Sequence, residues 1–182
     1  MRRFAAGLVA ACMLLPAVPR CQTVVEEYQL KAAFLFNFAR YVTWPESAFS
    51  GADGVFVLGV LGADPFGHRL DEAIDGREVQ GRRVVARRFE NPADAGAAQV
   101  LYVGISDPIA LRQALAALAR RPVLTVSDTE GFRAAGGMIE LRTEDRRLRF
   151  DVNVDVAQQV SLRPSAQLLK LAKNVRGTWR ER

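Results

Sequence analysis

Residues 54–61 read Gly-Val-Phe-Val-Leu-Gly-Val-Leu, and this stretch decides the fold. A short apolar run bounded by turn residues is typical of a strand that is buried on both faces of a parallel sheet. Residues 99–105 (QVLYVGI) and 122–126 (PVLTV) repeat that signature. Residues 82–89 (RRVVARRF) read as a further strand, whose arginines are typical of an edge strand protected from aggregation but could also attract an acidic partner surface.

Two segments between these strands carry helix-start signals. Asp64 precedes Pro65 and Asp107 precedes Pro108, so each aspartate is predicted to cap a helix and each proline to occupy its first position. Strands that alternate with helices through short turns predict right-handed crossovers and a largely parallel sheet.

The pattern changes after residue 137. Residues 138–142 and 148–153 are predicted to form a hairpin, and residues 154–160 and 164–173 are predicted to be helical. We therefore predict an α/β fold, a three-layer sandwich with a mostly parallel mixed sheet, a C-terminal β-hairpin and a terminal helix.

Upstream of the first strand, residues 24–42 predict a long helix that ends before Trp44 and Pro45. Leu30, Phe34, Phe38 and Tyr41 form one predicted apolar stripe along it, and further apolar residues lie off that stripe. A helix that is apolar over more than half of its circumference is either deeply buried or shared between a core and a partner.

The first 21 residues have the features of an export signal. Two arginines precede an apolar stretch at residues 4–15, which is shorter than the roughly 20 residues needed to span a bilayer. We predict a cleaved signal peptide at residues 1–21 and one exported domain at residues 22–182. A lipid anchor at Cys21 is not expected, because Arg20 is too bulky for that signal. The mature chain then holds at most one cysteine and no internal disulfide.

The overall charge does not indicate nucleic-acid binding. The 182-residue chain has 25 basic and 20 acidic side chains, but three arginines lie in the predicted signal peptide, which contains no acidic residue. The remaining 22 basic and 20 acidic side chains nearly balance.

The sequence contains no convincing catalytic constellation, and we expect no enzyme activity, no cofactor and no metal centre. The single histidine, His68, has no neighbouring nucleophile or metal ligand and is predicted to lie at the surface. The glycines after the first strand lack the spacing of a dinucleotide or phosphate loop. Carboxylates and arginines alternate along the predicted hairpin, which favours cross-strand charge pairing on a solvated face.

One loop is a candidate small-ligand site. Ser127 and Asp128 follow a predicted central strand at its carboxyl end, where open α/β sheets bind their ligands. Phe132 and Gly137 follow closely. The alternative is a capped turn whose glycines adopt positive φ.

Several blocks in the same order resemble the YfiR/HmsC-like family of periplasmic proteins, from residue 28 to residue 173. The blocks are KAAFLFNFARYV at 31–42 with Trp44-Pro45, GADPFG at 62–67, VLTVSD at 123–128, GF at 131–132, GGMI at 136–139, RFDVN at 149–153 and SAQLLKLA at 165–172.

The resemblance implies a periplasmic regulator that represses an inner-membrane diguanylate cyclase by binding its periplasmic sensor domain. Cyclic-di-GMP and biofilm formation would then stay low. It also implies a homodimer and, as a second partner, an outer-membrane lipoprotein. Some relatives are encoded beside sensor kinases or outer-membrane receptors, so the partner here could be a sensor kinase. The absence of an internal disulfide departs from the best-known member.

For such a protein we predict that large apolar side chains of the first and last helices contact the partner. These candidates are Phe34, Phe38, Tyr41, Trp44, Leu168 and Leu171. The alternative hypothesis is a periplasmic sensor that binds an amino acid or similar metabolite near Ser127, Asp128, Phe132 and Gly137. A deep pocket at those residues would favour the sensor, and a filled surface would count against it.

Overall fold

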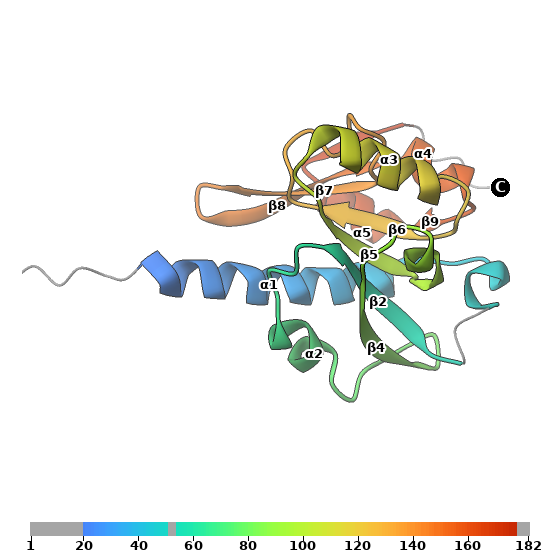
Figure 1. Cartoon of the computed structure of the whole chain (residues 1–182), viewed down its shortest axis with the longest axis horizontal. Coiled ribbons are helices and arrows are strands. Elements are labelled where there is room, and N and C mark those ends of the chain that lie inside the picture. The colour runs from blue at the N-terminus through green and yellow to red at the C-terminus, as the bar shows by residue number, and fades with distance from the viewer. Residues whose placement is uncertain (1–19, 51–53, 178–182) are drawn as a thin grey trace, which may run out of the picture.

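A computed structural model describes residues 20–50 and 54–177 of the chain (Figure 1). Within those ranges an eight-stranded sheet has the order β10-β8-β7-β6-β5-β2-β4-β3. Its strands are β2 (Phe56–Gly62), β3 (Glu78–Val79), β4 (Arg82–Phe89), β5 (Val100–Gly104), β6 (Leu124–Ser127), β7 (Ile139–Glu144), β8 (Arg147–Asn153) and β10 (Asn174–Arg176). A separate antiparallel pair joins β1 (Val42–Thr43) to β9 (Arg163–Pro164).

The helices are α1 (Arg20–Tyr41), α2 (His68–Ile74), α3 (Pro108–Leu118), α4 (Val154–Gln159) and α5 (Ala166–Leu171), with short 3-10 turns at η1 (Glu46–Phe49) and η2 (Asp94–Ala97). Residues 1–19 of the predicted signal peptide lie outside the described part of the chain. Among the described helices, none is both long enough and apolar enough to cross a membrane.

The central strands run parallel, as predicted. β2 pairs in parallel with β4 on one side and with β5 on the other, and β5, β6 and β7 continue in parallel. The predicted hairpin is confirmed as the antiparallel pair β7–β8. It turns at Asp145 and Arg146, which both have positive φ, as a tight two-residue hairpin turn requires. After β4 the chain crosses over β2 and continues with β5 on the other side. The order in which strands are added to the sheet therefore reverses between β2 and β5.

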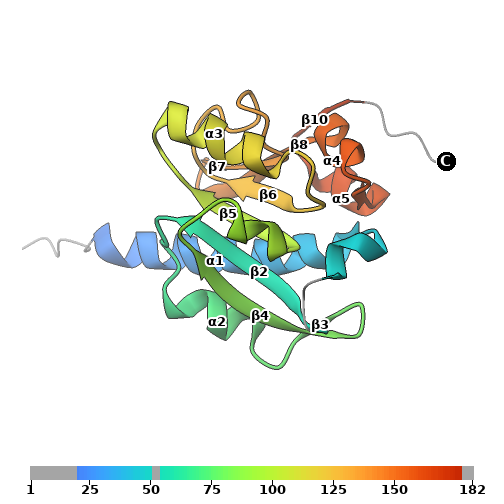
Figure 2. The same ribbon diagram turned by 45° about the vertical axis from the view of Figure 1, so that its right-hand side comes forward.

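Two apolar cores make the three layers (Figure 2). One core lies between the sheet and a layer that contains α1 and α2. The other lies on the opposite face, where buried side chains of α3 and η2 meet β2 and β5. The predicted three-layer α/β sandwich with a mostly parallel mixed sheet is confirmed.

The buried face of α1 differs from the predicted stripe. Of the predicted stripe, Phe38 is fully buried, but the other buried apolar side chains of the helix are Ala32, Leu35, Phe36 and Ala39, at the i, i+3, i+4, i+7 spacing of a helix face. Leu30 is 46% exposed. The prediction gave weight to the large side chains. The two alanines are small enough to let the helix backbone approach the sheet.

The start of α2 also differs from the prediction. Asp64 does not cap the helix, which begins four residues later at His68. Its carboxylate instead accepts hydrogen bonds from the backbone N–H groups of Phe66 and Gly67, at 2.8 and 3.1 Å. The Asp64-Pro65 pair therefore forms a local turn before the helix. At α3 the prediction holds, since Asp107 accepts from the N–H groups of Ile109 and Ala110.

Candidate functional site

Three of the predicted partner-binding side chains lie in the core. Phe38 is 1% exposed and packs against Phe150 with ring centroids 5.1 Å apart. Trp44 packs against Phe56 at 5.1 Å, and its indole N–H donates to the Gln99 carbonyl at 3.2 Å. Leu168 is 2% exposed. These positions stabilise the fold and are not available to a partner in this conformation.

The other three predicted partner-binding residues remain accessible in part. Phe34 and Tyr41 are half-buried at the edge of the same core. Leu171, at the end of α5, is 61% exposed. Leu171 is thus the most exposed of the six side chains predicted from the sequence to meet a partner.

The predicted ligand site after β6 is largely filled. The Ser127 hydroxyl donates to the Val103 carbonyl at 2.7 Å and accepts from the Thr129 N–H at 3.1 Å. Phe132 is fully buried, and a Cβ added to Gly137 would lie only 2.2 Å from its ring. The glycine is therefore needed for close packing of Phe132, and the space that a ligand would use is taken by this ring.

The fourth residue of that predicted site, Asp128, belongs to a charged cluster. Lys31 of α1 places its ammonium 2.5 Å from one carboxylate oxygen of Asp128 and 2.7 Å from Glu27. Tyr102 donates to the other oxygen at 2.5 Å, and Tyr28 donates to the first at 3.1 Å. Lys31 is only 3% exposed, so its charge depends on these partners.

The ionisation of the cluster follows from its geometry. Burial would raise the pKa of the Asp128 carboxyl, but hydrogen bonds from Lys31 and Tyr102 outweigh burial and lower that pKa below its ordinary value. Burial would likewise lower the pKa of the Lys31 ammonium, but its carboxylate partners raise it instead. Burial and the hydrogen bond to Asp128 raise the pKa of the Tyr102 phenol. The cluster therefore contains a charged lysine and ionised carboxylates near neutral pH.

This cluster attaches α1 to the carboxyl ends of β5 and β6. Aromatic packing continues the attachment, because the Phe66 ring lies 5.7 Å from Tyr28 and 4.7 Å from Tyr102. Glu27 also accepts from the Thr143 hydroxyl of the hairpin at 2.9 Å. Asp128 could be predicted as a site residue from the sequence, whereas Lys31 was missed, because its only signal is a cation inside an apolar helical run.

Backbone contacts close the space between the ends of β2 and β5, where the order of the strands reverses. Open α/β sheets bind ligands at such a point, here between the ends of β2 and β5. The Ala63 N–H donates to the Gly104 carbonyl at 3.0 Å, which joins the two loops directly. A Cβ on Gly104 would lie 2.1 Å from the Ala63 oxygen. This contact agrees with the glycine spacing after β2, which does not match a dinucleotide or phosphate loop.

A second charged cluster corrects the prediction that the hairpin charges lie on a solvated face. Asp151 is fully buried and Glu140 is 5% exposed, directly opposite each other on β8 and β7. Arg133 contacts both, since its guanidinium donates to Asp151 at 3.0 Å and its backbone N–H donates to Glu140 at 3.0 Å, and Arg142 also forms an ion pair with Asp151. Asn174 of β10 donates to Asp151 at 2.8 Å. Arg133 and Asn174 thereby fix the loop after β6 and strand β10 to the hairpin.

A surface groove lies between the β7–β8 hairpin and the end of α5. Its volume is about 700 Å³, and it is lined by Glu144, Asp145, Arg147, Arg149, Lys170, Leu171, Ala172 and Lys173. Lys173 on one wall contacts Glu144 on the other. The Lys173 ammonium donates a hydrogen bond to the Glu144 carboxylate, and this lowers the pKa of the Glu144 carboxyl. Lys173 and Glu144 are paired with each other. The remaining charged side chains of the groove are three cations, Arg147, Arg149 and Lys170, and one anion, Asp145. The exposed Leu171 lies on the same wall.

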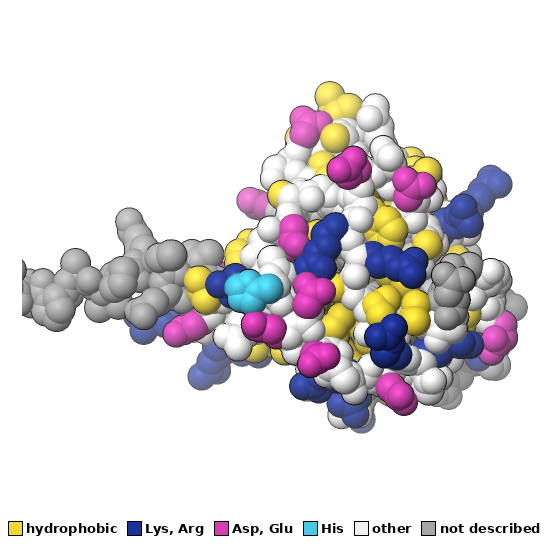
Figure 3. All heavy atoms as spheres, turned by 60° about the horizontal axis from the view of Figure 1, so that its bottom comes forward, with side chains coloured by type: hydrophobic (Ala, Val, Ile, Leu, Met, Phe, Trp, Pro, Cys, Tyr) yellow, Lys and Arg dark blue, Asp and Glu magenta, His cyan; other side chains and the backbone are white. Residues whose placement is uncertain are grey.

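Charges elsewhere on the surface are more evenly balanced. Figure 3 shows basic and acidic side chains side by side on one face of the molecule. Arg88 of the basic strand β4 donates to Asp64 at 3.0 Å and to Asp71 at 2.7 Å. The exposed His68, predicted to lie at the surface, is 3.6 Å from Glu72. Among the described residues, no group of three or more metal-ligating side chains comes together.

Comparison with known proteins identifies relatives of the whole folded region. A family model described as YfiR/HmsC-like matches residues 28–173. A solved structure, that of a conserved domain protein from Vibrio cholerae O1 biovar El Tor, matches with a TM-score of 0.52 and 13% identity. The match covers 84% of this chain and 60% of that one, and at this identity it shows a shared fold alone.

Proposed function

Because the chain belongs to the YfiR/HmsC-like family, we propose that it is a periplasmic regulatory protein that binds and represses an inner-membrane signalling protein. The family is regulatory rather than catalytic and is known for periplasmic regulation of diguanylate cyclases. The partner we propose is the periplasmic sensor domain of such a cyclase, so that binding lowers cyclic-di-GMP and restrains biofilm formation. The single observation that carries the proposal is the family match over residues 28–173.

The proposed mechanism is a shift in the population of cyclase states. Moving a two-state protein from mostly active to mostly inactive requires the regulator to favour one state by roughly 5 kcal/mol. An interface of about 800 Å² per partner with a few well-packed anchors can supply that difference. The accessible members of the predicted anchor set, Leu171, Phe34 and Tyr41, are the candidates for this role.

The proposal includes the path by which the chain reaches its partner. Residues 1–21 act as a cleaved signal peptide, and residues 22–182 act in the periplasm as a homodimer without a lipid anchor. An outer-membrane lipoprotein is a second proposed partner that would sequester the regulator. If the cognate partner is a sensor kinase instead of a cyclase, the same binding mode applies to its periplasmic domain.

The metabolite-sensor alternative is not put forward as a second function. The side chains of Ser127 and Phe132 already contact protein groups, and Gly137 lies against the Phe132 ring. The Asp128 carboxylate already accepts three hydrogen bonds.

The proposal is tested by measuring cellular cyclic-di-GMP after deletion of the gene in the organism that encodes it. We expect the level to rise on deletion and to return when the full chain is restored. A matched control restores only residues 22–182, without the proposed signal peptide, and should fail to lower the level because the protein stays in the cytoplasm. An unchanged level on deletion would contradict repression of a cyclase.

A further inference from the structure

The β7–β8 hairpin has an open backbone edge beside the groove. β10 pairs with β8 only at Asp151, Val152 and Asn153. Just before β10, the Lys173 N–H donates to the Phe150 carbonyl at 2.8 Å, and upstream of that point α5 turns away. Within the described ranges, no strand therefore pairs with residues 147–149 on this side, and the hairpin extends beyond the body of the sheet (Figure 1).

The backbone groups at this edge can be assigned from the strand period. In an antiparallel ladder, alternate residues direct their N–H and C=O groups toward the partner strand and away from it. The Phe150 carbonyl faces away from β7, because it accepts from Lys173. Leu148, two residues earlier, therefore directs its N–H and C=O groups to the same open side. The three open residues of β8, 147–149, correspond to about 10 Å of edge, enough for a short added strand.

The side chains along this edge favour a negatively charged occupant. Arg147 and Arg149 are both exposed and, being two residues apart, project from the same face of the hairpin. Lys170 faces them from the α5 side of the groove. None of these three cations forms an ion pair with a described residue. Side chains on an added strand would alternate, so carboxylates two residues apart would lie beside the two arginines.

We propose that the groove between the β7–β8 hairpin and α5 binds an extended acidic segment of the partner protein, which adds as a strand to the open edge of β8. This inference deepens the proposed function and rests on its claim that the chain acts by binding a protein. Apolar side chains that alternate with the carboxylates would face Leu148, which is half-buried on the other face of the hairpin. Lys173 would exchange Glu144 for a carboxylate of the incoming segment.

The two terminal segments outside the described ranges do not suit the groove. Residues 1–19 contain Arg2 and Arg3 and no acidic side chain, and residues 178–182 contain two arginines and one glutamate. Both segments would place cations in a groove that already has an excess of them. A second copy that met the first groove-to-groove would bring the same cations together. Charge complementarity therefore selects a different, acidic chain.

A peptide-binding measurement tests the proposal without requiring a cyclase. The probe is a fluorescent eight-residue peptide of alternating glutamate and valine, with a lysine–valine peptide as its charge-reversed counterpart, and binding to the full chain is followed by anisotropy. Reversing charge with Arg147→Glu and Arg149→Glu should weaken the acidic peptide by tenfold or more and allow the basic peptide to bind. Leu148→Pro removes the outward N–H and should therefore abolish binding of the acidic peptide to the otherwise native chain and of the basic peptide to the charge-reversed chain. Leu148→Val keeps that N–H and should retain binding in both cases.

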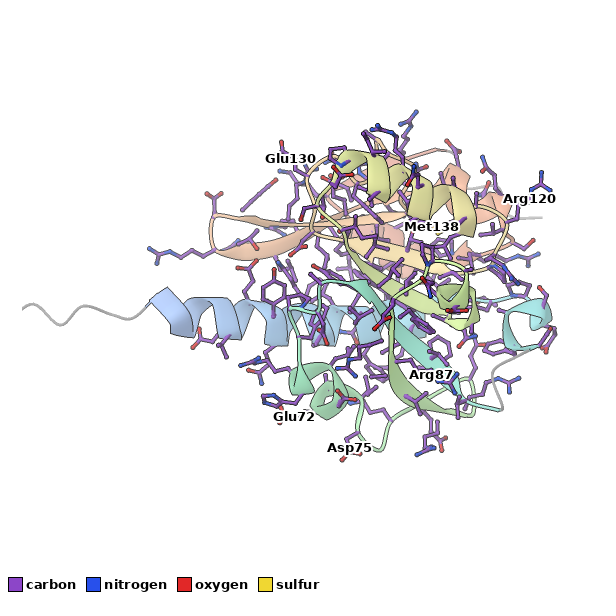
Figure 4. All side chains as sticks on the ribbon, viewed as in Figure 1. Glu72, Asp75, Arg87, Arg120, Glu130 and Met138 are labelled. Atoms are coloured by element: carbon purple, nitrogen blue, oxygen red, sulfur yellow. The ribbon has the colours of Figure 1, made fainter. Side chains whose placement is uncertain are left out.

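A control variant separates the groove from the general surface. Arg112→Glu in α3, combined with Arg120→Glu just after that helix, changes the net charge equally, and Arg120 lies at the end of the molecule opposite to the hairpin (Figure 4). It should leave affinity for the acidic peptide within about twofold. Equal loss in this control would overturn the proposal, since binding would be non-specific attraction.

Retained binding in a folded Leu148→Pro protein would overturn strand addition. If the peptide binds as expected but gene deletion leaves cyclic-di-GMP unchanged, the cyclase assignment fails while the groove assignment stands.

Discussion

Replacing Asp128 by asparagine should destabilise the fold, because the buried Lys31 would lose a charged partner. Breaking a buried ion pair by removing one member typically costs about 3–5 kcal/mol. The Asp128 side chain keeps 20% of its surface exposed and Glu27 remains 2.7 Å from the lysine. We therefore expect the free energy of unfolding to fall by about 2–3 kcal/mol, at or below the lower limit of that range.

The measurement is urea denaturation at pH 7, followed by circular dichroism. Glu130→Gln is the matched control, because it neutralises an exposed carboxylate two residues away (Figure 4) and should change the free energy by less than about 0.5 kcal/mol. The double variant Lys31→Met with Asp128→Asn should be more stable than the sum of the two single effects predicts. Additive effects, or an unaffected Asp128→Asn protein, would refute the view that this ion pair attaches α1 to the sheet.

The same pair predicts a dependence of stability on pH. The folded-state pKa of the Asp128 carboxyl lies below its ordinary value of 3.8, so its contribution is present above that value and is lost as the pH falls through the lower, folded pKa. The free energy of unfolding should therefore decrease below about pH 4 in the native protein and decrease less steeply in Asp128→Asn. Parallel pH profiles for the two proteins would contradict this assignment.

Two further predictions concern packing, and both are measured by thermal or urea unfolding. Gly137→Ala should destabilise the protein by about 1–3 kcal/mol, because the added methyl would overlap the fully buried Phe132 ring, and an unchanged stability would mean that this ring can move. Leu35→Ala should cost about 2–5 kcal/mol and Leu30→Ala less than about 0.5 kcal/mol, since Leu35 is 1% and Leu30 46% exposed. The reverse order would contradict the orientation of α1.

The architecture could be predicted because local signals were consistent with one another. Apolar runs marked β2, β5 and β6, and Asp107 with Pro108 marked the start of α3. The hairpin was predicted correctly because its two strands are adjacent in sequence. Strands β1, β3, β9 and β10 were missed, because they contain three residues or fewer. Strands β1, β9 and β10 also form only when a distant segment supplies their hydrogen bonds.

The candidate sites could be predicted only in part. Burial of Phe38 and Leu168 depends on how α1 and α5 rotate against the sheet, and that rotation is set by tertiary packing rather than by helical spacing. Burial of Trp44 depends on its contact with Phe56 of β2. The pairing of Lys31 with Asp128 joins residues that are 97 positions apart, so no local pattern contains it. The open edge of β8 likewise depends on where α5 diverges from the strand.

The most direct test of the regulatory account is to add the protein, purified from the periplasm, to spheroplasts of the deletion strain and to measure cytoplasmic cyclic-di-GMP. The account predicts a dose-dependent fall, since the protein reaches only the outer face of the inner membrane and must act through a periplasmic domain. A level that stays unchanged, with the added protein folded and the cyclase active, would contradict the account.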